Sequence, residues 1–304
     1  DEIIDALQKD FGNRDPKSSF LTEIASTIGV LEHAIKNVDK WTKDEKRPSN
    51  VDRPFFIRML MGLLGSKSYI KYQPLGTVGV ISPWNFPVNL ILAPLGGIFA
   101  AGNRAMIKPS ELTPETSEVT KKMFEAYFDK SEAAVFTGDA EVGAAFSALP
   151  FDHLLFTGGT QIGKKVMKAA SDNLVPVTLE LGGKSPVIVD ENADLSEVAK
   201  KVMRGKTMNA GQICLAPDYL MLPKGKSGEF AKASNEAVSE MFADLKYNED
   251  YTSVINERHY ERINELVSDA KEKGAEVIQI NPADEDFEQQ ELHKIPPTLV
   301  LNPT

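Results

Sequence analysis

The spacing of hydrophobic positions divides the chain into stretches of different character. Up to Trp41, apolar residues recur every three or four positions, which predicts two amphipathic helices. Residues 43–54 are charged and contain two prolines, which is typical of a loop. From residue 78 onward, short β-rich runs alternate with helical segments of about a dozen residues, as expected for βαβ units.

The alternating part predicts a doubly wound parallel sheet followed by a second α/β unit. The strands expected in the first sheet are residues 78–81, 105–107, 133–136, 153–156 and 175–179. The second unit is expected to contain a strand at 186–189, helices at 195–208, 228–242 and 257–273, and a final strand at 296–301. We therefore predict two domains: N-terminal helices and a dinucleotide-binding domain at 1–182, and a catalytic α/β domain at 183–304.

Charge and apolar run length exclude two classes of partner. With 34 basic and 44 acidic residues, the formal charge of −10 would repel a nucleic acid backbone. The longest apolar run, 86–101, is interrupted by Pro87 and Pro94 and is shorter than the roughly 18 residues of a membrane span. It predicts a buried helix, and no membrane association is expected.

Cys214 is the only cysteine, so no disulfide can form within the chain. A lone thiol fits a reducing compartment, and we expect a cytoplasmic protein. The chain begins at Asp1 rather than at Met, so a targeting segment could have preceded it. Gly211 and Pro217 flank the cysteine and predict an irregular, accessible backbone. On these local grounds a nucleophile and a structural core thiol both remain open.

Glu180 and the glycine-rich segment 158–163 are expected at strand exits. Glu180 closes an apolar run just before Gly182 and Gly183, and ligands gather at the strand ends of an open parallel sheet. A simple strand-end cap is the alternative. Gly158-Gly-Thr-Gln-Ile-Gly163 follows a strand and opens a helix, so its N–H groups could hold a pyrophosphate. Lys165 stands where a Walker A motif needs Ser or Thr, which disfavours a nucleoside triphosphatase.

Two further strand exits carry polar residues. No G-x-G-x-x-G is present, but Lys108 and Glu111 follow a strand and could bind ribose hydroxyls, with a charged surface turn as the alternative. Pro83-Trp-Asn-Phe-Pro87 forms a rigid segment around Asn85. Its amide would be an oxyanion donor near Cys214, or else would cap the next helix. The histidines show no metal-ligand spacing, and we predict no metal.

Taken together, five motifs resemble the ordered signature of the aldehyde dehydrogenase superfamily. They are Pro83-Trp-Asn-Phe-Pro87, Lys108-Pro-Ser-Glu111, Phe156-Thr-Gly-Gly-Thr160, Glu180-Leu-Gly-Gly-Lys184 and Gly211-Gln-Ile-Cys214. Phe11-Gly-Asn-Arg14, Cys214-Leu-Ala-Pro-Asp-Tyr219 and Tyr251-Thr-Ser-Val-Ile-Asn256 are similar to the class 3 branch and most closely to bacterial coniferyl aldehyde dehydrogenases. The resemblance implies the aldehyde dehydrogenase fold and an aromatic or medium-chain aldehyde as the substrate. It also implies that the full-length protein is a homodimer.

The resemblance also implies a role for each site residue. Cys214 would be the nucleophile, Glu180 the base that activates water for thioester hydrolysis, and Asn85 an oxyanion donor. The cofactor would be NAD, with NADP also possible, because Glu111 disfavours a 2′-phosphate. The residues that would bind it are Ser82, Pro83, Trp84, Lys108, Glu111, Gly138, Gly158, Gly159, Ile162, Gly163, Leu181 and Gly182.

The chain departs from the family pattern in two respects. Gly159 stands where the family usually has Ser, which removes one contact to phosphate. The chain ends before the family's Glu-Glu-Ile-Phe-Gly-Pro segment and its dimerisation hairpin, so we expect the C-terminal part of the protein to be missing. Two alternatives remain: a coenzyme A-acylating relative, which the presence of Glu180 disfavours, and a non-catalytic dinucleotide-binding fragment.

Overall fold

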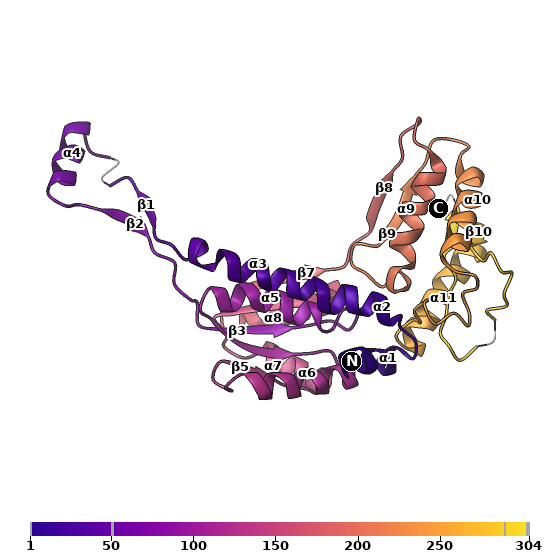
Figure 1. Cartoon of the computed structure of the whole chain (residues 1–304), viewed down its shortest axis with the longest axis horizontal. Helices are drawn as coiled ribbons and strands as arrows, with labels where there is room; N and C mark the ends of the chain where they lie inside the picture. Colours follow the sequence, from indigo (N-terminus) through magenta and orange to yellow (C-terminus); the bar gives the residue numbers. More distant parts are fainter. Residues whose placement is uncertain (1, 50–51, 289, 302–304) are drawn as a thin grey trace.

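The structure is a computed structural model that describes residues 2–49, 52–288 and 290–301. Figure 1 shows a sheet layered with helices, a narrow arm that projects from it at the left, and a second group of helices and strands at the right. The architecture agrees with the predicted α/β class. Asp1, Asn50 and Val51, which belong to the predicted first helix and loop, lie outside the described residues.

The N-terminal segment forms the two predicted helical stretches. Helix α1 spans Glu2–Phe11. The second stretch runs without a break through α2 (Pro16–Ser19), the π-helix η1 (Phe20–Ala25) and α3 (Ser26–Trp41). It begins at Pro16 because Asp15 accepts hydrogen bonds from the N–H groups of Lys17 and Ser18, as an N-cap residue does.

The prediction of a loop at 43–54 is wrong for residues 45–47, which form a strand. Residues Glu45–Arg47 form strand β1, which pairs antiparallel with β2 (Ser68–Ile70), and helix α4 (Phe55–Leu63) lies between them. Both strands have only three residues and are largely exposed, so no alternation of polar and apolar positions marks them. These elements form the arm in Figure 1, and no residue of α4 is buried.

The central sheet confirms the predicted doubly wound topology. Its five strands are parallel in the order β5-β4-β3-β6-β7. They are β3 (Thr77–Ile81), β4 (Arg104–Lys108), β5 (Ala133–Val135), β6 (His153–Gly158) and β7 (Val177–Leu181). The connecting helices are α5 (Asn89–Ala100), α6 (Pro114–Tyr127), α7 (Ala140–Ser147) and α8 (Thr160–Ser171). Strands β6 and β7 extend two residues further than predicted, so Gly158 and Glu180 lie inside strands.

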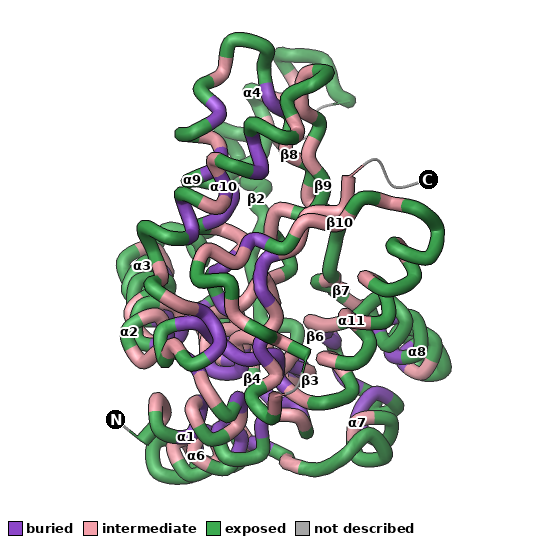
Figure 2. Tube along the Cα trace, turned by 90° about the vertical axis from the view of Figure 1, so that its right-hand side faces the viewer, coloured by how far each residue is buried: buried purple, intermediate pink, exposed green. Residues whose placement is uncertain are grey.

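Buried side chains on both faces hold this sheet between its helices. On one face, Val78 and Val80 of β3 pack with Ile91 and Leu95 of α5. A second cluster, which includes Leu154 and Phe156 of β6, packs against α7 and α8. Figure 2 shows buried stretches along these strands and also on the helices that surround them. Helix α5 is therefore the buried helix predicted at 86–101.

The second region contains the predicted helices and two strands that were not predicted. Its elements are β8 (Ser185–Ile188), α9 (Leu195–Thr207), the 3-10 helix η2 (Met208–Gly211), β9 (Pro217–Met221), α10 (Ser227–Met241), α11 (Glu257–Glu272), β10 (Glu276–Gln279) and β11 (Thr298–Leu301). Strands β8 and β9 pair in parallel, and β10 and β11 pair antiparallel. The domain boundary at residue 182 falls between two separate sheets, but it stays a prediction. Among the described residues, no helix combines the length and hydrophobicity needed to cross a membrane.

Candidate active site

The five parallel strands bring the predicted site residues to one edge of the sheet. Because the strands are parallel, their carboxyl ends all lie at this edge. Every strand carries predicted site residues at or just after that end. They are Gly138 after β5, Lys108 and Glu111 at β4, Ser82, Pro83, Trp84 and Asn85 after β3, Gly158, Gly159, Ile162 and Gly163 at β6, and Glu180, Leu181 and Gly182 at β7.

The order of the strands creates a topological switch point between β3 and β6. The chain proceeds from β3 outward to β4 and β5, then returns to β6 on the other side of β3. Such a switch point is where open α/β sheets bind ligands. Ser82 lies there, and its buried hydroxyl oxygen has no hydrogen-bond partner among the described residues. A polar ligand would supply that partner.

The glycine-rich turn after β6 is open in a way that suits a pyrophosphate. Gly159 occupies the N-cap position of α8 without a side-chain hydrogen bond, and a Cβ placed on it would have no atom within 4 Å. At Gly163, in contrast, a Cβ would lie 2.9 Å from Cδ2 of Leu181, so glycine lets α8 approach β7. The exposed helix N-terminus is suited to an anion. Ile162 is half exposed beside it, at 51%.

Lys108 and Glu111 meet beside the turn that contains Gly138. The ammonium of Lys108 is buried, donates a 2.7 Å hydrogen bond to the carbonyl oxygen of Pro109, and lies 3.7 Å from Oε2 of Glu111. Burial lowers the pKa of Lys108, and the nearby carboxylates of Glu111 and Asp139 oppose that shift. Gly138 has a φ of 148°, where a Cβ would collide with Val142. These residues can present both a donor and an acceptor to ribose hydroxyls.

Trp84 packs its ring between segments distant in sequence. Its ring centroid lies 6.2 Å from that of Phe11 and 5.4 Å from that of His259. The same small cluster contains Leu7 and Ile255. The indole therefore connects α1, the segment after β3 and the start of α11, and its predicted cofactor contact stays a prediction.

The loop that carries Cys214 has an irregular backbone, as predicted. Asn209, Ala210 and Gly211 have φ values of 48°, 50° and 75°, a conformation that is costly for the two residues that have a Cβ. Cys214 follows as a free, exposed thiol. It is therefore accessible, which excludes the alternative of a buried structural thiol.

The side chain of Gln212 holds this strained loop in place. Its Nε2 donates to the carbonyl oxygens of Asn209 and Ser253, each at 3.0 Å. Its Oε1 accepts a 3.1 Å hydrogen bond from the N–H of Ile255. One amide thus joins the cysteine loop to residues 253–255, about forty positions later in the chain.

Asn85 is brought to the cysteine loop. Its Nδ2 donates to the carbonyl oxygen of Gln212 at 2.9 Å, two residues before Cys214. Its Oδ1 accepts from the N–H of Phe86. The alternative that Asn85 caps the next helix is wrong, because the carboxylate of Glu23 accepts from Val88 and Asn89 at the start of α5.

Glu180 lies in the last part of β7, paired with Thr157, and its side chain is exposed. The chain continues from Glu180 into β8, whose first residue Ser185 pairs with Pro217, three residues after Cys214. Lys184 and Asp218 form a 3.1 Å ion pair across these two segments. The segment that follows Glu180 and the segment that follows Cys214 are therefore paired, from residues 185 and 217 onward.

Two buried charged residues near Asn85 were not predicted as part of the site. Arg14 and Glu23 form a 2.8 Å ion pair, and Arg14 also donates to the carbonyl oxygen of Asn85. Burial raises the pKa of Glu23 and lowers that of Arg14, and their mutual attraction opposes both shifts. The only sequence signal was Phe11-Gly-Asn-Arg14, which was noted for its resemblance and not for a role.

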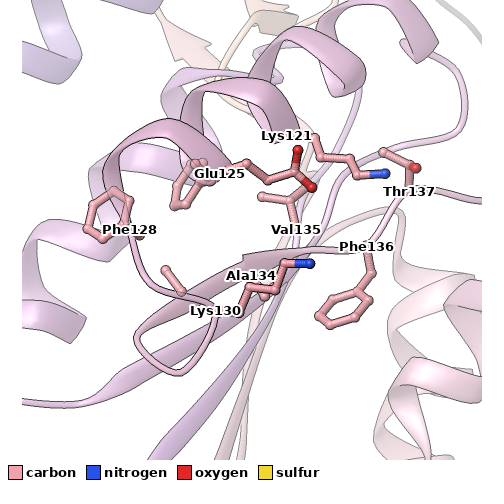
Figure 3. A pocket seen from close by; sticks show the side chains of 10 residues that line it. Lys121, Glu125, Phe128, Lys130, Ala134, Val135, Phe136 and Thr137 are labelled. Atoms are coloured by element: carbon pink, nitrogen blue, oxygen red, sulfur yellow. The ribbon is translucent and has the colours of Figure 1, made fainter.

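One further feature borders this site at the end of β5, where Thr137 directly precedes Gly138. A pocket of about 310 Å³ lies between α6 and β5, and Figure 3 shows Lys121, Glu125 and Lys130 among its lining residues. None of the ten residues that line it is a predicted site residue. In the described part of the chain, no three His, Cys, Asp or Glu side chains form a group suited to a metal ion.

A doubly wound sheet with an exposed cysteine loop at its carboxyl edge defines an α/β protein with a topological switch point and a candidate thiol nucleophile. The sequence profile of the aldehyde dehydrogenase family matches residues 1–304, and the chain belongs to this family. This confirms the predicted resemblance and the predicted fold class.

Similar proteins support the same family assignment. The chain is 56% identical over 303 residues to a probable coniferyl aldehyde dehydrogenase of Caulobacter vibrioides, covering 100% of this chain and 61% of the relative. It is 50% identical over 300 residues to the coniferyl aldehyde dehydrogenase of Pseudomonas sp., covering 99% and 60%. The chain thus spans about 60% of the length of these relatives.

Solved structures share the fold over most of the chain. The substrate-bound AldH of Staphylococcus aureus has a TM-score of 0.80 at 39% identity, over 89% of this chain and 57% of that one. The NAD+ complex of an aldehyde dehydrogenase from Bacillus cereus has a TM-score of 0.83 at 25% identity, over 100% and 59%.

The role of Gln212 can be tested by removing its amide. Gln212→Ala leaves the buried partners at Ser253 and Ile255 unpaired, so we expect a loss of about 1–3 kcal/mol of unfolding free energy. Urea unfolding measures the loss, and hydrogen exchange should show faster exchange at the Ile255 N–H. The exposed Gln279 is the control, because Gln279→Ala should change stability by less than about 0.5 kcal/mol. Equal effects of the two substitutions would contradict this role.

Proposed function

We propose that the full-length protein oxidises an aldehyde to the carboxylic acid, with NAD as the hydride acceptor. The observation that carries the proposal is the hydrogen bond from Asn85 to Gln212, which brings an amide donor to the loop of an exposed cysteine. A nucleophile and an oxyanion donor at the carboxyl edge of a parallel sheet are suited to chemistry on a carbonyl group.

In the proposed reaction, each protein group has one task. The Cys214 thiolate attacks the aldehyde carbon, and the Asn85 amide and the Cys214 N–H donate to the resulting oxyanion. NAD, when bound, accepts the hydride that leaves this carbon. Glu180 then takes a proton from the water that cleaves the thioester, which releases the acid and the thiol.

The residues at the strand ends fit the proposed cofactor. The turn at Gly158 and Gly159, which is open at Gly159, would hold the pyrophosphate, and Lys108 with Glu111 would hold the adenosine ribose. Ser82 would gain a polar partner, while Leu181 and Gly182 would face the nicotinamide. A 2′-phosphate would lie beside the Glu111 carboxylate, so NAD is favoured over NADP.

An aromatic aldehyde of the coniferyl type is the substrate that we propose. The support is the 50% to 56% identity to proteins with that name over nearly the whole chain. A reactive Cys214 must stay reduced, which supports a cytoplasmic location.

We also propose that the full-length protein is a homodimer. Helix α4 carries an arm patch of exposed apolar residues that the described residues do not cover: Phe55, Phe56, Met59, Leu60, Leu63 and Leu64. A patch of this kind on a projecting arm is typical of an association surface. A second copy of the protein would bury it.

The first test is NADH formation by the full-length protein. We expect turnover with coniferyl aldehyde to exceed that with a short aliphatic aldehyde, and Cys214→Ala to abolish both, because the substitution removes the proposed nucleophile. Faster turnover of the short aldehyde would contradict the substrate, and no NADH with either would contradict the function. Activity retained by Cys214→Ala would exclude the thiol mechanism.

A second test concerns Glu180. Glu180→Gln removes the base but keeps the size of the side chain, so the thioester should accumulate on Cys214 after one burst of NADH. Mass spectrometry of the quenched protein measures the acyl adduct. Unchanged steady-state turnover would refute the role of Glu180. Release of the acyl group from Cys214 by coenzyme A rather than by water would favour the acylating alternative.

A third test concerns the arm patch. Leu63→Glu places a charge among side chains that a dimer would bury, so the dimer dissociation constant should rise at least roughly tenfold. Light scattering with size-exclusion chromatography measures it. Leu266→Glu, on the exposed side of α11, is the matched control and should leave the dimer intact. Dimers that persist in Leu63→Glu would exclude the patch as the interface.

A further inference from the structure

The start of helix α5 is capped by a buried carboxylate from a distant segment. Oε2 of Glu23 accepts hydrogen bonds from the N–H groups of Val88, at 3.1 Å, and Asn89, at 2.8 Å. Glu23 is fully buried and lies within the π-helix η1, which places it against the segment after β3. A carboxylate at a helix N-terminus satisfies free N–H groups and interacts favourably with the helix dipole. The cap therefore fixes one end of the segment that contains Asn85.

Arg14 fixes the other end of the same segment. Its Nη2 donates to Oε1 of Glu23 at 2.8 Å, and its Nη1 donates to the carbonyl oxygen of Asn85 at 3.1 Å. The guanidinium lies 4.6 Å from the centroid of the Phe11 ring and 5.2 Å from that of Phe86. Because the guanidinium is planar, its two bonds hold Glu23 and the Asn85 peptide at a fixed relative orientation.

This arrangement controls where the Asn85 side chain points. The Asn85 carbonyl also accepts from Nδ2 of Asn209 at 3.1 Å, so donors from two segments hold this peptide group. With the backbone fixed, the side-chain amide is directed to Gln212 at the cysteine loop. A rotation of the peptide would move the amide away from Cys214.

Stability alone does not account for a buried ion pair at this position. The free energy needed to remove two charges from water is about as large as the free energy gained from their attraction. A buried ion pair therefore adds little to the net stability of the fold. Helix α6 shows a simpler solution, since the partly exposed Asp10 accepts from Glu115 and Thr116 at its start without an arginine. What distinguishes Arg14 is its second bond, to Asn85.

We propose that Arg14, oriented by Glu23, is a positioning residue that directs the Asn85 amide toward the Cys214 oxyanion. The inference rests on the proposed function, because it assumes that Asn85 is the oxyanion donor. Arg14 itself does not touch the reacting atoms and acts only through Asn85.

The test is a double-mutant cycle in the full-length protein. Arg14→Lys keeps the charge beside Glu23 but lacks the planar fork, so it cannot hold both partners. It should lower kcat/KM for the aldehyde roughly tenfold in the wild-type background and less than about twofold in Asn85→Ala, where no amide remains to be positioned. The Kd for NAD, measured by fluorescence, should stay within about twofold in both backgrounds.

The matched control is Asp10→Asn, which weakens a helix cap that has no bond to Asn85. Any effect on activity should be the same factor in the wild-type and Asn85→Ala backgrounds. If Arg14→Lys also lowers kcat/KM by one factor in both backgrounds, Arg14 is merely structural and the proposal is overturned.

Hydrogen exchange provides a readout that does not depend on activity. Arg14→Lys and Glu23→Gln should both speed exchange at the N–H groups of Val88 and Asn89 and in the loop at 209–214, whereas α10 should be unaffected. Glu23→Gln keeps the side-chain volume and serves if Arg14→Lys fails to fold. Wild-type exchange rates in both segments would overturn the positioning role, whereas absence of NADH from the wild-type protein would refute only the proposed function.

Discussion

The parallel pairing of five strands is the constraint on which the site depends. In a parallel sheet every strand needs a crossover helix, so every carboxyl end opens at the same edge. Five segments that are far apart in sequence, from Ser82 to Gly182, are thereby brought within one row. The reversal of strand order between β3 and β6 makes this point of the edge a typical place for a ligand. Without this topology the same motifs would be scattered over the surface.

A second constraint is the support given to a strained loop. Asn209 and Ala210 hold backbone conformations that isolated residues avoid, so the loop keeps its shape only because other groups oppose its relaxation. The amide of Gln212 and the side chain of Asn209 make these bonds, and their partners lie in two separate segments, at Asn85 and at 253–255. The loop that carries the exposed thiol of Cys214 is thus held in one conformation by these hydrogen bonds.

The N-terminal segment contributes more to the site than its position in the chain indicates. Asn13 donates to the carbonyl oxygen of Tyr251 at 2.7 Å, and its own carbonyl accepts from Ser253. Its neighbour Arg14 reaches Asn85. Two consecutive residues therefore connect the segment after β3 with the segment that supports Gln212. Phe11, Trp84 and Ile255 belong to one small hydrophobic cluster next to these bonds.

Local patterns in the sequence were sufficient for the sheet and for the chemistry of individual residues. Runs such as 78–81 and 153–156 predicted β3 and β6 because buried parallel strands are continuously apolar. Turn residues around Cys214 predicted its exposure. The three-residue strands β1 and β2 gave no such signal, since neither face is buried and pairing between distant segments leaves no local period.

By itself, the sequence determined the α/β class, the order of the motifs and the identity of the thiol, carboxylate and amide, because these depend on residue type and local spacing. Only the tertiary structure decided which groups meet. Glu23 and Arg14 lie more than sixty positions before the residues that they hold, and Gln212 lies about forty before its partners. The residues next to a buried charged residue in the sequence do not indicate which distant residue will pair with it. Its burial is possible only because the fold brings a compensating charge and donors to it.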